Sequence, residues 1–428
     1  MEAQRKLSRT LVVFLALACF ALVPGLTWAG SQHEKNEQPA AAAPAPAAEP
    51  AKPSLNCMEC HGSTEPKFPV LGAKLGYEVS GHAILGDARY ANAGGCQRCH
   101  TNEGYIQYVQ MGFDTPKFDA FATPAAPAAQ PFIDYPSQPG CFTCHDPHTR
   151  GDFILRTQTV DKATKAVTNQ KITLYNGAVF DAGAGNLCAS CHQARGNVQT
   201  ATVALKGVIS ARVTSHHGPE ADMIAGTNGY EFAGRKYGTS PHYAVVENAC
   251  VTCHMEQPNA RYGFSPEVGG HAFTVVGEVH EAPTGNISNC LVCHGKDLKT
   301  VAAKKYINTT ITSTKDTVYF TLKAKADFDH DGTIEYVQQE VQGLLDKLLN
   351  TKGTGVMQTM ANPMFKPDGA FTNNTKVVYT NDQLGAYANL LYVIEDKSLG
   401  VHNATYAIEL LMDSIQAIDP TFDVSNRP

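Results

Sequence analysis

The pattern of apolar and polar positions predicts helices in the C-terminal part of the chain. Residues 334–349 (IEYVQQEVQGLLDKLL) place apolar side chains at helical spacing, which predicts an amphipathic helix. Residues 384–396 and 406–418 show the pattern of two further helices, and the first of these helices is expected to end near Gly400. Residues 305–323 are rich in Thr and alternate partly between apolar and polar, which predicts a small hairpin. We therefore predict a mainly α fold with little regular β.

The first 29 residues have the pattern of a secretory signal peptide, with a basic start, an apolar run and a small-residue cleavage site before Gly30. A retained membrane anchor is the alternative, but Pro24 and Gly25 interrupt a run that is short against the ~20 residues a span needs. Cys19 raises a lipoprotein as a further alternative. We expect an exported protein, in the periplasm or at the outer cell surface, without a transmembrane segment in the mature chain.

Composition narrows the class of protein. The chain is 43% hydrophobic and 17% charged, which is typical of globular proteins. Its net charge of -6 shows no basic excess, so we expect no binding to nucleic acid. A single Trp and 8% aromatic residues are few for a chain of 428 residues, and bound aromatic cofactors could fill a core instead.

Twelve of the 13 cysteines form six Cys-x-x-Cys pairs, and His directly follows each pair. In this motif the two thiols attach to the vinyl groups of a porphyrin, and the adjacent imidazole is the proximal ligand of the haem iron. Zinc ribbons, redox pairs and disulfides also use Cys-x-x-Cys, but none of them requires a His after every pair. We therefore predict six covalently bound haem c groups. In chain order, the first to sixth haem sites are Cys57, Cys60 and His61; Cys96, Cys99 and His100; Cys141, Cys144 and His145; Cys188, Cys191 and His192; Cys250, Cys253 and His254; and Cys290, Cys293 and His294.

The spacing of the six sites predicts the domain organisation. They leave about 40 residues of chain for each haem, too few for a separate core around each one. The haems are therefore expected to pack against each other, which favours electron transfer between irons. We expect a hexahaem domain at residues 56–299, after an Ala/Pro-rich linker at residues 30–55. Residues 300–428 lack cysteine and are expected to form a helical region that packs on the haem core.

The sixth coordination position of each iron decides its function, because a second strong ligand blocks substrate and an open position admits it. Ten His remain beyond the six proximal ones. His33 lies in the linker and His330 in an acidic loop, so neither is expected to bind iron. The other eight are enough to fill all six positions. We expect His280 and one of the adjacent His216 and His217 to be spare. The eight are His82, His148, His216, His217, His242, His271, His280 and His402.

From His82 onwards the order of motifs resembles the pentahaem ammonia-forming cytochrome c nitrite reductases and the octahaem hydroxylamine oxidoreductases. The resemblance implies a haem-packed core and a set of distal ligands. These are His82 for the fourth haem, His271 for the third, His242 for the sixth and His402 for the fifth. The first and second haems are then left for His148 and His217, with His216 as the alternative to His217.

Departures from that family argue against its chemistry. Members that reduce nitrite commonly carry Lys after the Cys pair of the catalytic haem, whereas the second site has His100. A Glu-Tyr pair after the fourth site, which supplies a calcium ligand and a catalytic phenol in the family, is replaced by Ala194 and Arg195. We therefore predict an electron carrier with bis-His haems and no catalytic residue. The alternative is a reductase or oxidase of a small nitrogen or sulfur compound, with a five-coordinate haem at the second site.

The expected partners follow from this function. They are redox proteins or an extracellular electron acceptor, and the sequence leaves open whether the chain is a monomer, a dimer or a unit of a stacked filament.

A calcium site is predicted in the C-terminal region. Asp327, Asp329 and Asp331 match the opening of an EF-hand loop. The usual Glu is missing at the twelfth loop position, and Glu335 or Glu340 is the candidate replacement. The alternative is a solvated acidic turn that caps the following helix.

Overall fold

The computed structural model describes residues 70–84, 94–122, 136–146, 153–210, 215–257, 267–279, 282–306, 314–372 and 374–428. All of them belong to one compact unit. Helices predominate within these ranges, and the strands pair into separate two-stranded antiparallel sheets. The mainly α fold class is therefore confirmed. No helix in this part of the chain is both long and apolar enough to cross a bilayer. The predicted signal peptide and linker lie outside the described residues.

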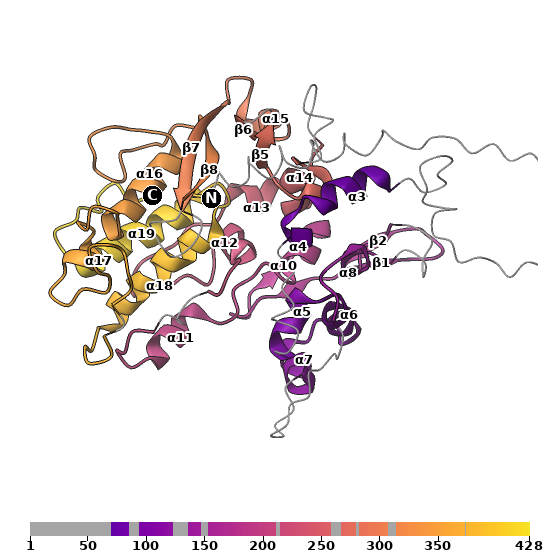
Figure 1. Cartoon of the computed structure of the whole chain (residues 1–428), viewed down its shortest axis with the longest axis horizontal. Helices are drawn as coiled ribbons and strands as arrows, with labels where there is room; N and C mark the ends of the chain where they lie inside the picture. The colour runs from indigo at the N-terminus through magenta and orange to yellow at the C-terminus, as the bar shows by residue number, and fades with distance from the viewer. Residues whose placement is uncertain are drawn as a thin grey trace, which may run out of the picture. The chain divides into compact units, whose positions relative to one another are not determined.

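The predicted haem-binding region, in its described residues from 70 to 299, consists of short helices and short hairpins (Figure 1). Its helices are α3 (Leu71–Glu78), α4 (Gly81–Ile84), η2 (Gly94–Cys96), α5 (Gln97–His100), α6 (Asn102–Gln110), α7 (Thr115–Ala122), α8 (Cys141–Cys144), η3 (Gly183–Gly185), α10 (Asn186–Ala189), α11 (Val198–Ala204), α12 (Glu220–Ala225), α13 (Pro241–Val245), α14 (Cys250–His254), η5 (Gly270–Ala272) and α15 (Cys290–His294). The sheets pair β1 (Gln158–Val160) with β2 (Val167–Asn169), β3 (Ile172–Thr173) with β4 (Val179–Phe180), and β5 (Val276–Val279) with β6 (Ala282–Gly285).

The main hydrophobic core lies in the C-terminal region. It is built by α16 (Val337–Leu348), α18 (Asn381–Asp396) and α19 (Ala404–Ile418), with the short α17 (Val356–Thr359) beside them. Helices α18 and α19, in yellow in Figure 1, lie side by side. All residues from Leu384 to Asp396 are buried. In the described residues before 300, Val198, Ile209, Met223 and Tyr230 join this core, and the other apolar clusters are smaller, as expected if porphyrins supply much of the apolar packing there.

The connection between α18 and α19 is fixed at both ends. Thr380 caps the start of α18, and the helix ends at Asp396 because Lys397 adopts a left-handed conformation with φ of 61°. Asn403 caps α19 by accepting a hydrogen bond from the Tyr406 N–H. The prediction that the first of these helices ends near Gly400 was therefore wrong by a few residues. Residues 397–403 form the connecting loop.

Two other predicted elements are present with shifted bounds. Helix α16 begins at Val337 rather than residue 334, because Tyr336 pairs with Lys323 in an isolated β-bridge and caps the helix. The predicted hairpin is formed by β7 (Thr300–Tyr306) and β8 (Thr314–Phe320), so it begins before residue 305.

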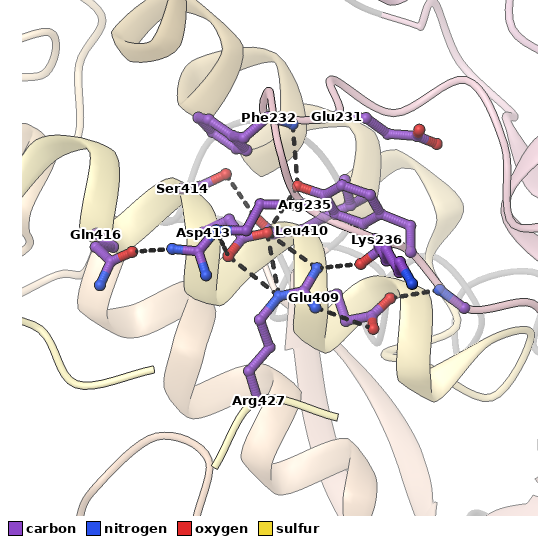
Figure 2. A network of polar contacts seen from close by, with 12 residues as sticks. Glu231, Phe232, Arg235, Lys236, Glu409, Leu410, Asp413, Ser414, Gln416 and Arg427 are labelled. Carbon is purple, nitrogen blue, oxygen red and sulfur yellow. Dashed lines mark hydrogen bonds and ion pairs between the residues drawn. The ribbon is translucent and has the colours of Figure 1, made fainter. Parts of the chain in front are cut away.

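A buried ionic network attaches the C-terminal end to α19 and to a loop of the haem-binding region (Figure 2). The Arg427 Nε lies 3.1 Å from both carboxylate oxygens of Asp413, and its Nη1 lies 3.3 Å from Glu409 Oε1. The guanidinium also donates to the Lys236 carbonyl and lies over the Tyr237 ring. Both carboxylates are buried, and Arg427 pairs with each of them, while the Arg235 Nε lies 3.6 Å from Asp413 Oδ1 as a second cation.

Candidate haem-binding sites

Five of the six Cys-x-x-Cys-His motifs lie in the described part of the chain, each on or directly beside a short helical turn. These turns are α5, α8, α10, α14 and α15. Residues three apart in a helical turn share one face, so the two thiols of a motif point to the same side. The first site, with Cys57, Cys60 and His61, lies outside the described residues. So do His148, its expected distal ligand, and His280.

Each of the five proximal imidazoles faces a second imidazole from a distant part of the chain. Four of these pairs are the ones implied by the family resemblance, and the fifth involves His216. The ring centroids are 6.5 Å apart for His100 and His216, 6.2 Å for His145 and His271, 6.1 Å for His192 and His82, 6.2 Å for His254 and His402, and 6.0 Å for His294 and His242.

This spacing fits one metal ion held between two imidazoles. A bond from a metal to an imidazole nitrogen is about 2 Å long, and that nitrogen lies about 1 Å from the ring centre, so rings on opposite sides of one metal have centroids about 6 Å apart. Rings that contact each other directly approach more closely, as the 5.1 Å between His216 and His217 shows. The donor set of each described site, two thiols and two opposed imidazoles, fits haem c with iron held on both faces.

His216, rather than His217, faces the proximal His100. The Nδ1 of His217 instead lies 2.9 Å from Oε2 of the buried Glu395, and the His217 side chain is 69% exposed. The structure thus favours the alternative ligand that the sequence left open for the second haem.

Three of the facing imidazoles are held by main-chain carbonyls. Nδ1 of His145, His242 and His254 each lies 3.0 Å from a carbonyl oxygen. A carbonyl can only accept, so Nδ1 carries the hydrogen and Nε2 is left as the nitrogen available to a metal. These carbonyls, from Phe153, Val401 and Phe273 respectively, fix the tautomer and orient the ring.

Two other imidazoles are held by carboxylates. The Nδ1 of His402 lies 2.6 Å from Asp396 Oδ1, and the Nδ1 of His192 lies 3.3 Å from Glu220 Oε2. Burial acts to lower the pKa of each imidazole, but the charge of its carboxylate outweighs burial and raises the pKa to about 9. For His82, burial and then the charge of His192 lower the pKa to about 4. The contrast shows how strongly Glu220 and Asp396 interact with their imidazoles.

The loop after α18 serves two haem sites at once. His402 faces the proximal imidazole of the fifth site, and the neighbouring Val401 carbonyl holds His242, which faces that of the sixth. Asp396 is fixed in turn by Ser398, whose hydroxyl and N–H both donate to Oδ2. The side chain of Asp396 is fully buried. The haem-free C-terminal region therefore contributes directly to the geometry of two sites.

Cysteines of different motifs meet in space. The thiol of Cys99 in the second site lies close enough to interact with that of Cys191 in the fourth, and the thiol of Cys188 in the fourth with that of Cys250 in the fifth. Cys253 of the fifth site lies close enough to Cys290 of the sixth for the two groups to interact electrostatically. These four sites therefore follow one another in the order second, fourth, fifth, sixth.

Phe273 connects the third site to this series. Its ring packs edge-on against His82 at 4.9 Å and against His271 at 5.6 Å, and its carbonyl accepts the hydrogen bond from His254. It therefore contacts imidazoles of the third, fourth and fifth sites. Phe273 has a φ of 57°, an uncommon backbone conformation for a bulky residue.

Two arginines surround the second site. Arg98, inside its Cys-x-x-Cys motif, is buried, donates to Thr115 and Tyr175, and lies over the Tyr108 ring at 5.2 Å. Arg195 Nη1 lies 3.7 Å from the Sγ of Cys96. Because His216 stands opposite His100, a substrate could reach an iron at this site only if His216 moved away.

The acidic loop gathers carboxylates as the calcium prediction requires. Asp327, Asp329 and Glu340 form one group, and Asp329, Asp331 and Glu335 another, with one ligand oxygen per residue within 4.8 Å of the others. Burial, together with the charges of Asp331 and Glu340, raises the pKa of Asp329 to about 6. Both candidate replacements for the missing Glu therefore lie at the loop. The N–H groups of Asp331 and Gly332 also bond to Asp327, so a solvated turn remains the alternative.

Several residues that shape the sites escaped the sequence analysis. Asp396, Glu220 and Phe273 belong to no short motif, and Val401 acts through its main chain. Of these residues, Glu220 alone lies in a segment that the sequence analysis could have used, because it ends the His-His-Gly-Pro-Glu stretch at residues 216–220.

Comparison with known proteins agrees with this donor geometry. Over 366 residues, 77% of the chain, the sequence is 25% identical to the C-type polyheme cytochrome OmcB of Geobacter sulfurreducens. It is 24% identical over 363 residues to the C-type polyheme cytochrome OmcC of the same organism. The chain is a multihaem cytochrome c. The alignments cover 44% and 43% of these relatives, so this cytochrome spans less than half of their length. No protein-family model and no solved structure matches it.

Proposed function

We propose that this multihaem cytochrome is an exported hexahaem electron carrier in which every iron is held by two imidazoles. The observation that carries the proposal is the set of five imidazole pairs with centroids 6.0–6.5 Å apart. With both axial positions filled by imidazole, an iron exchanges electrons and offers no position to a substrate. The sixth pair in this proposal is His61 with His148.

The chain supplies the ligands and the surroundings of each haem. A bound haem c supplies a one-electron couple between Fe(III) and Fe(II). The twelve motif cysteines hold the porphyrins covalently, and the proximal imidazoles bind on one face. Distal imidazoles close the other face, namely His82, His148, His216, His242, His271 and His402. Carbonyl and carboxylate partners on Nδ1 keep five of the described imidazoles in the tautomer that binds metal.

The contacts between sites support electron movement through the protein. Cysteines of the second and fourth sites meet, as do those of the fourth and fifth. Phe273 brings the third site to the same junction. We infer a path from the second site through the fourth and fifth to the sixth, with the third as a branch. Redox proteins or an extracellular acceptor would exchange electrons with sites at the ends of this path.

A reductase related to the nitrite reductases is the competing function. It needs an open iron with proton donors beside it, and the second site was its best candidate. His216 opposite His100 argues against an open position there. Voltammetry of the holoprotein adsorbed on an electrode separates the two. A carrier gives six one-electron waves that nitrite or hydroxylamine leaves unchanged, whereas a catalytic current on adding either compound would establish the enzyme.

We also propose that the acidic loop binds one Ca²⁺ through Asp327, Asp329 and Asp331, with Glu335 and Glu340 as further ligands. Five carboxylates gathered at one loop and helix start support this proposal. Its role would be structural, because the loop packs against the start of α16 rather than against a haem site.

A further inference from the structure

The groups that accept the Nδ1 hydrogen of the axial imidazoles divide the third to sixth haem sites into two kinds. At the third and sixth sites, the imidazoles of His145 and His242 donate to neutral carbonyls. At the fourth and fifth sites, His192 and His402 donate to the carboxylates of Glu220 and Asp396. The fifth site has one partner of each kind, because His254 donates to the Phe273 carbonyl.

A carboxylate changes the electronic character of an axial imidazole. By accepting the Nδ1 hydrogen it increases the basicity of Nε2, so the imidazole gives more electron density to the metal. Ferric iron carries one more positive charge than ferrous iron and gains more from this density and from the nearby negative charge. Both effects favour the oxidised state and lower the reduction potential.

The two carboxylates act at the same junction. The fourth and fifth sites are neighbours through the contact of Cys188 with Cys250. Glu220 also interacts electrostatically with His402, so its charge acts on the fifth site as well as on the fourth. These are the two middle sites in the series of four.

We propose that Glu220 and Asp396 are positioning residues that give the fourth and fifth haems lower reduction potentials than the third and sixth haems. The proposal rests on the proposed bis-His electron carrier. An electron that enters at the sixth haem would then pass next to a pair of haems of lower reduction potential.

The test is a redox titration of the complete holoprotein, wild type and variants, followed by electron paramagnetic resonance. In each step the electrode supplies one electron, which converts one Fe(III) to Fe(II). The signals are separable because axial imidazole planes near perpendicular give more anisotropic low-spin signals than planes near parallel. The pair at the fourth site is inclined at 86° and the pair at the fifth at 40°.

We expect Glu220→Gln to raise the potential of one haem of the perpendicular class most and that of one haem of the tilted class less. Asp396→Asn should raise mainly the potential of that tilted-class haem. Asp382→Asn is the matched control. It removes the same charge from the exposed start of the same helix, about 21 Å from Asp396 at 1.5 Å per residue. All potentials should match those of the wild type in this control.

The variants also distinguish an effect on the reduction potential from a purely structural role in holding the imidazole. If Asp396→Asn releases His402 and gives a high-spin haem, Glu220→Gln decides, because His192 is fixed by its own covalent motif. Unchanged potentials in Glu220→Gln, with all haems low-spin, would overturn the proposal and leave the electron-carrier function intact. A high-spin haem in the wild-type protein would instead refute the electron-carrier function itself.

Discussion

The Nδ1 atom of His242 lies 3.0 Å from the carbonyl oxygen of Val401, 159 residues further along the chain. This bond ties the sixth haem site to the loop between α18 and α19. The next residue, His402, faces the proximal imidazole of the fifth site. One loop of the haem-free region thereby sets the distal side of two haem sites, and this arrangement can be tested by removing single imidazoles.

His242→Ala should open the distal face of the sixth haem. The expected product keeps all six haems, since the cysteines are untouched, but one becomes high-spin and binds carbon monoxide when reduced. Optical titration with carbon monoxide gives the number of open sites, with one expected and none in the wild type. His330→Ala is the control, because His330 stacks on Phe422 and faces none of the five described proximal imidazoles. Carbon monoxide binding by the His330 variant would contradict the assignment.

The two adjacent histidines at residues 216 and 217 should differ in effect. His216→Ala is expected to convert the second haem to the high-spin state, whereas His217→Ala should leave every haem low-spin. The reason is that His216 faces His100 while His217 is bonded to Glu395. Low-temperature absorption and magnetic circular dichroism spectra of the oxidised variants distinguish the outcomes. The reverse pattern would restore His217 as the ligand.

Calcium should stabilise the protein in a pH-dependent way. The raised pKa of Asp329, about 6 against about 3.9 for a free Asp, means that the folded state holds this proton more tightly than the unfolded state. Without calcium, the contribution of Asp329 to stability therefore falls as the pH rises from about 4 to about 6. Calcium requires the ionised carboxylate and should offset this loss above pH 6.

The corresponding measurement is thermal unfolding with calcium or with a chelator at two pH values. At 100 times its Kd, calcium should add about 2.7 kcal/mol at pH 7 and much less at pH 5. Asp329→Asn should abolish the difference. An equal stability with calcium and with chelator at pH 7 would favour the solvated turn.

Arg427→Ala should destabilise the C-terminal core without touching the haems. It leaves Glu409 buried without its cation and leaves Asp413 with only the more distant Arg235, a change that costs about 3 kcal/mol. Denaturant unfolding followed by the circular dichroism of the helices measures this loss. The reduction potentials should stay at their wild-type values, because none of the five described haem sites uses the network. A loss below about 1 kcal/mol would show that water replaces the guanidinium.

The sequence predicted the features that depend on local pattern. The Cys-x-x-Cys-His motifs carry their chemistry within five residues, and the periodicity of α16, α18 and α19 is visible in single segments. The hairpin of β7 and β8 was also found, with its first strand beginning a few residues early. Helix ends were less accurate, because Lys397 rather than the nearby Gly400 ends α18, and no Gly or Pro marks Tyr336 at the start of α16.

Features that depend on contacts between distant parts of the chain could not be predicted from the sequence. Four facing pairs were expected from a family resemblance and not from spacing, and the choice between His216 and His217 stayed open. The bond between His217 and Glu395 spans 178 residues, so no local pattern could reveal which histidine was occupied elsewhere. The same holds for Asp396 and Glu220, whose roles depend on which imidazole folds against them, and for the order in which the sites meet.

The most direct test of the account is quantitative electron paramagnetic resonance of the oxidised wild-type holoprotein, with its haem content measured on the same sample. We predict six haems per chain, all low-spin, with perpendicular-class signals from the second, fourth and sixth sites and tilted-class signals from the third and fifth. A high-spin signal that integrates to one haem per chain would contradict the account, because an iron would then lack its second imidazole.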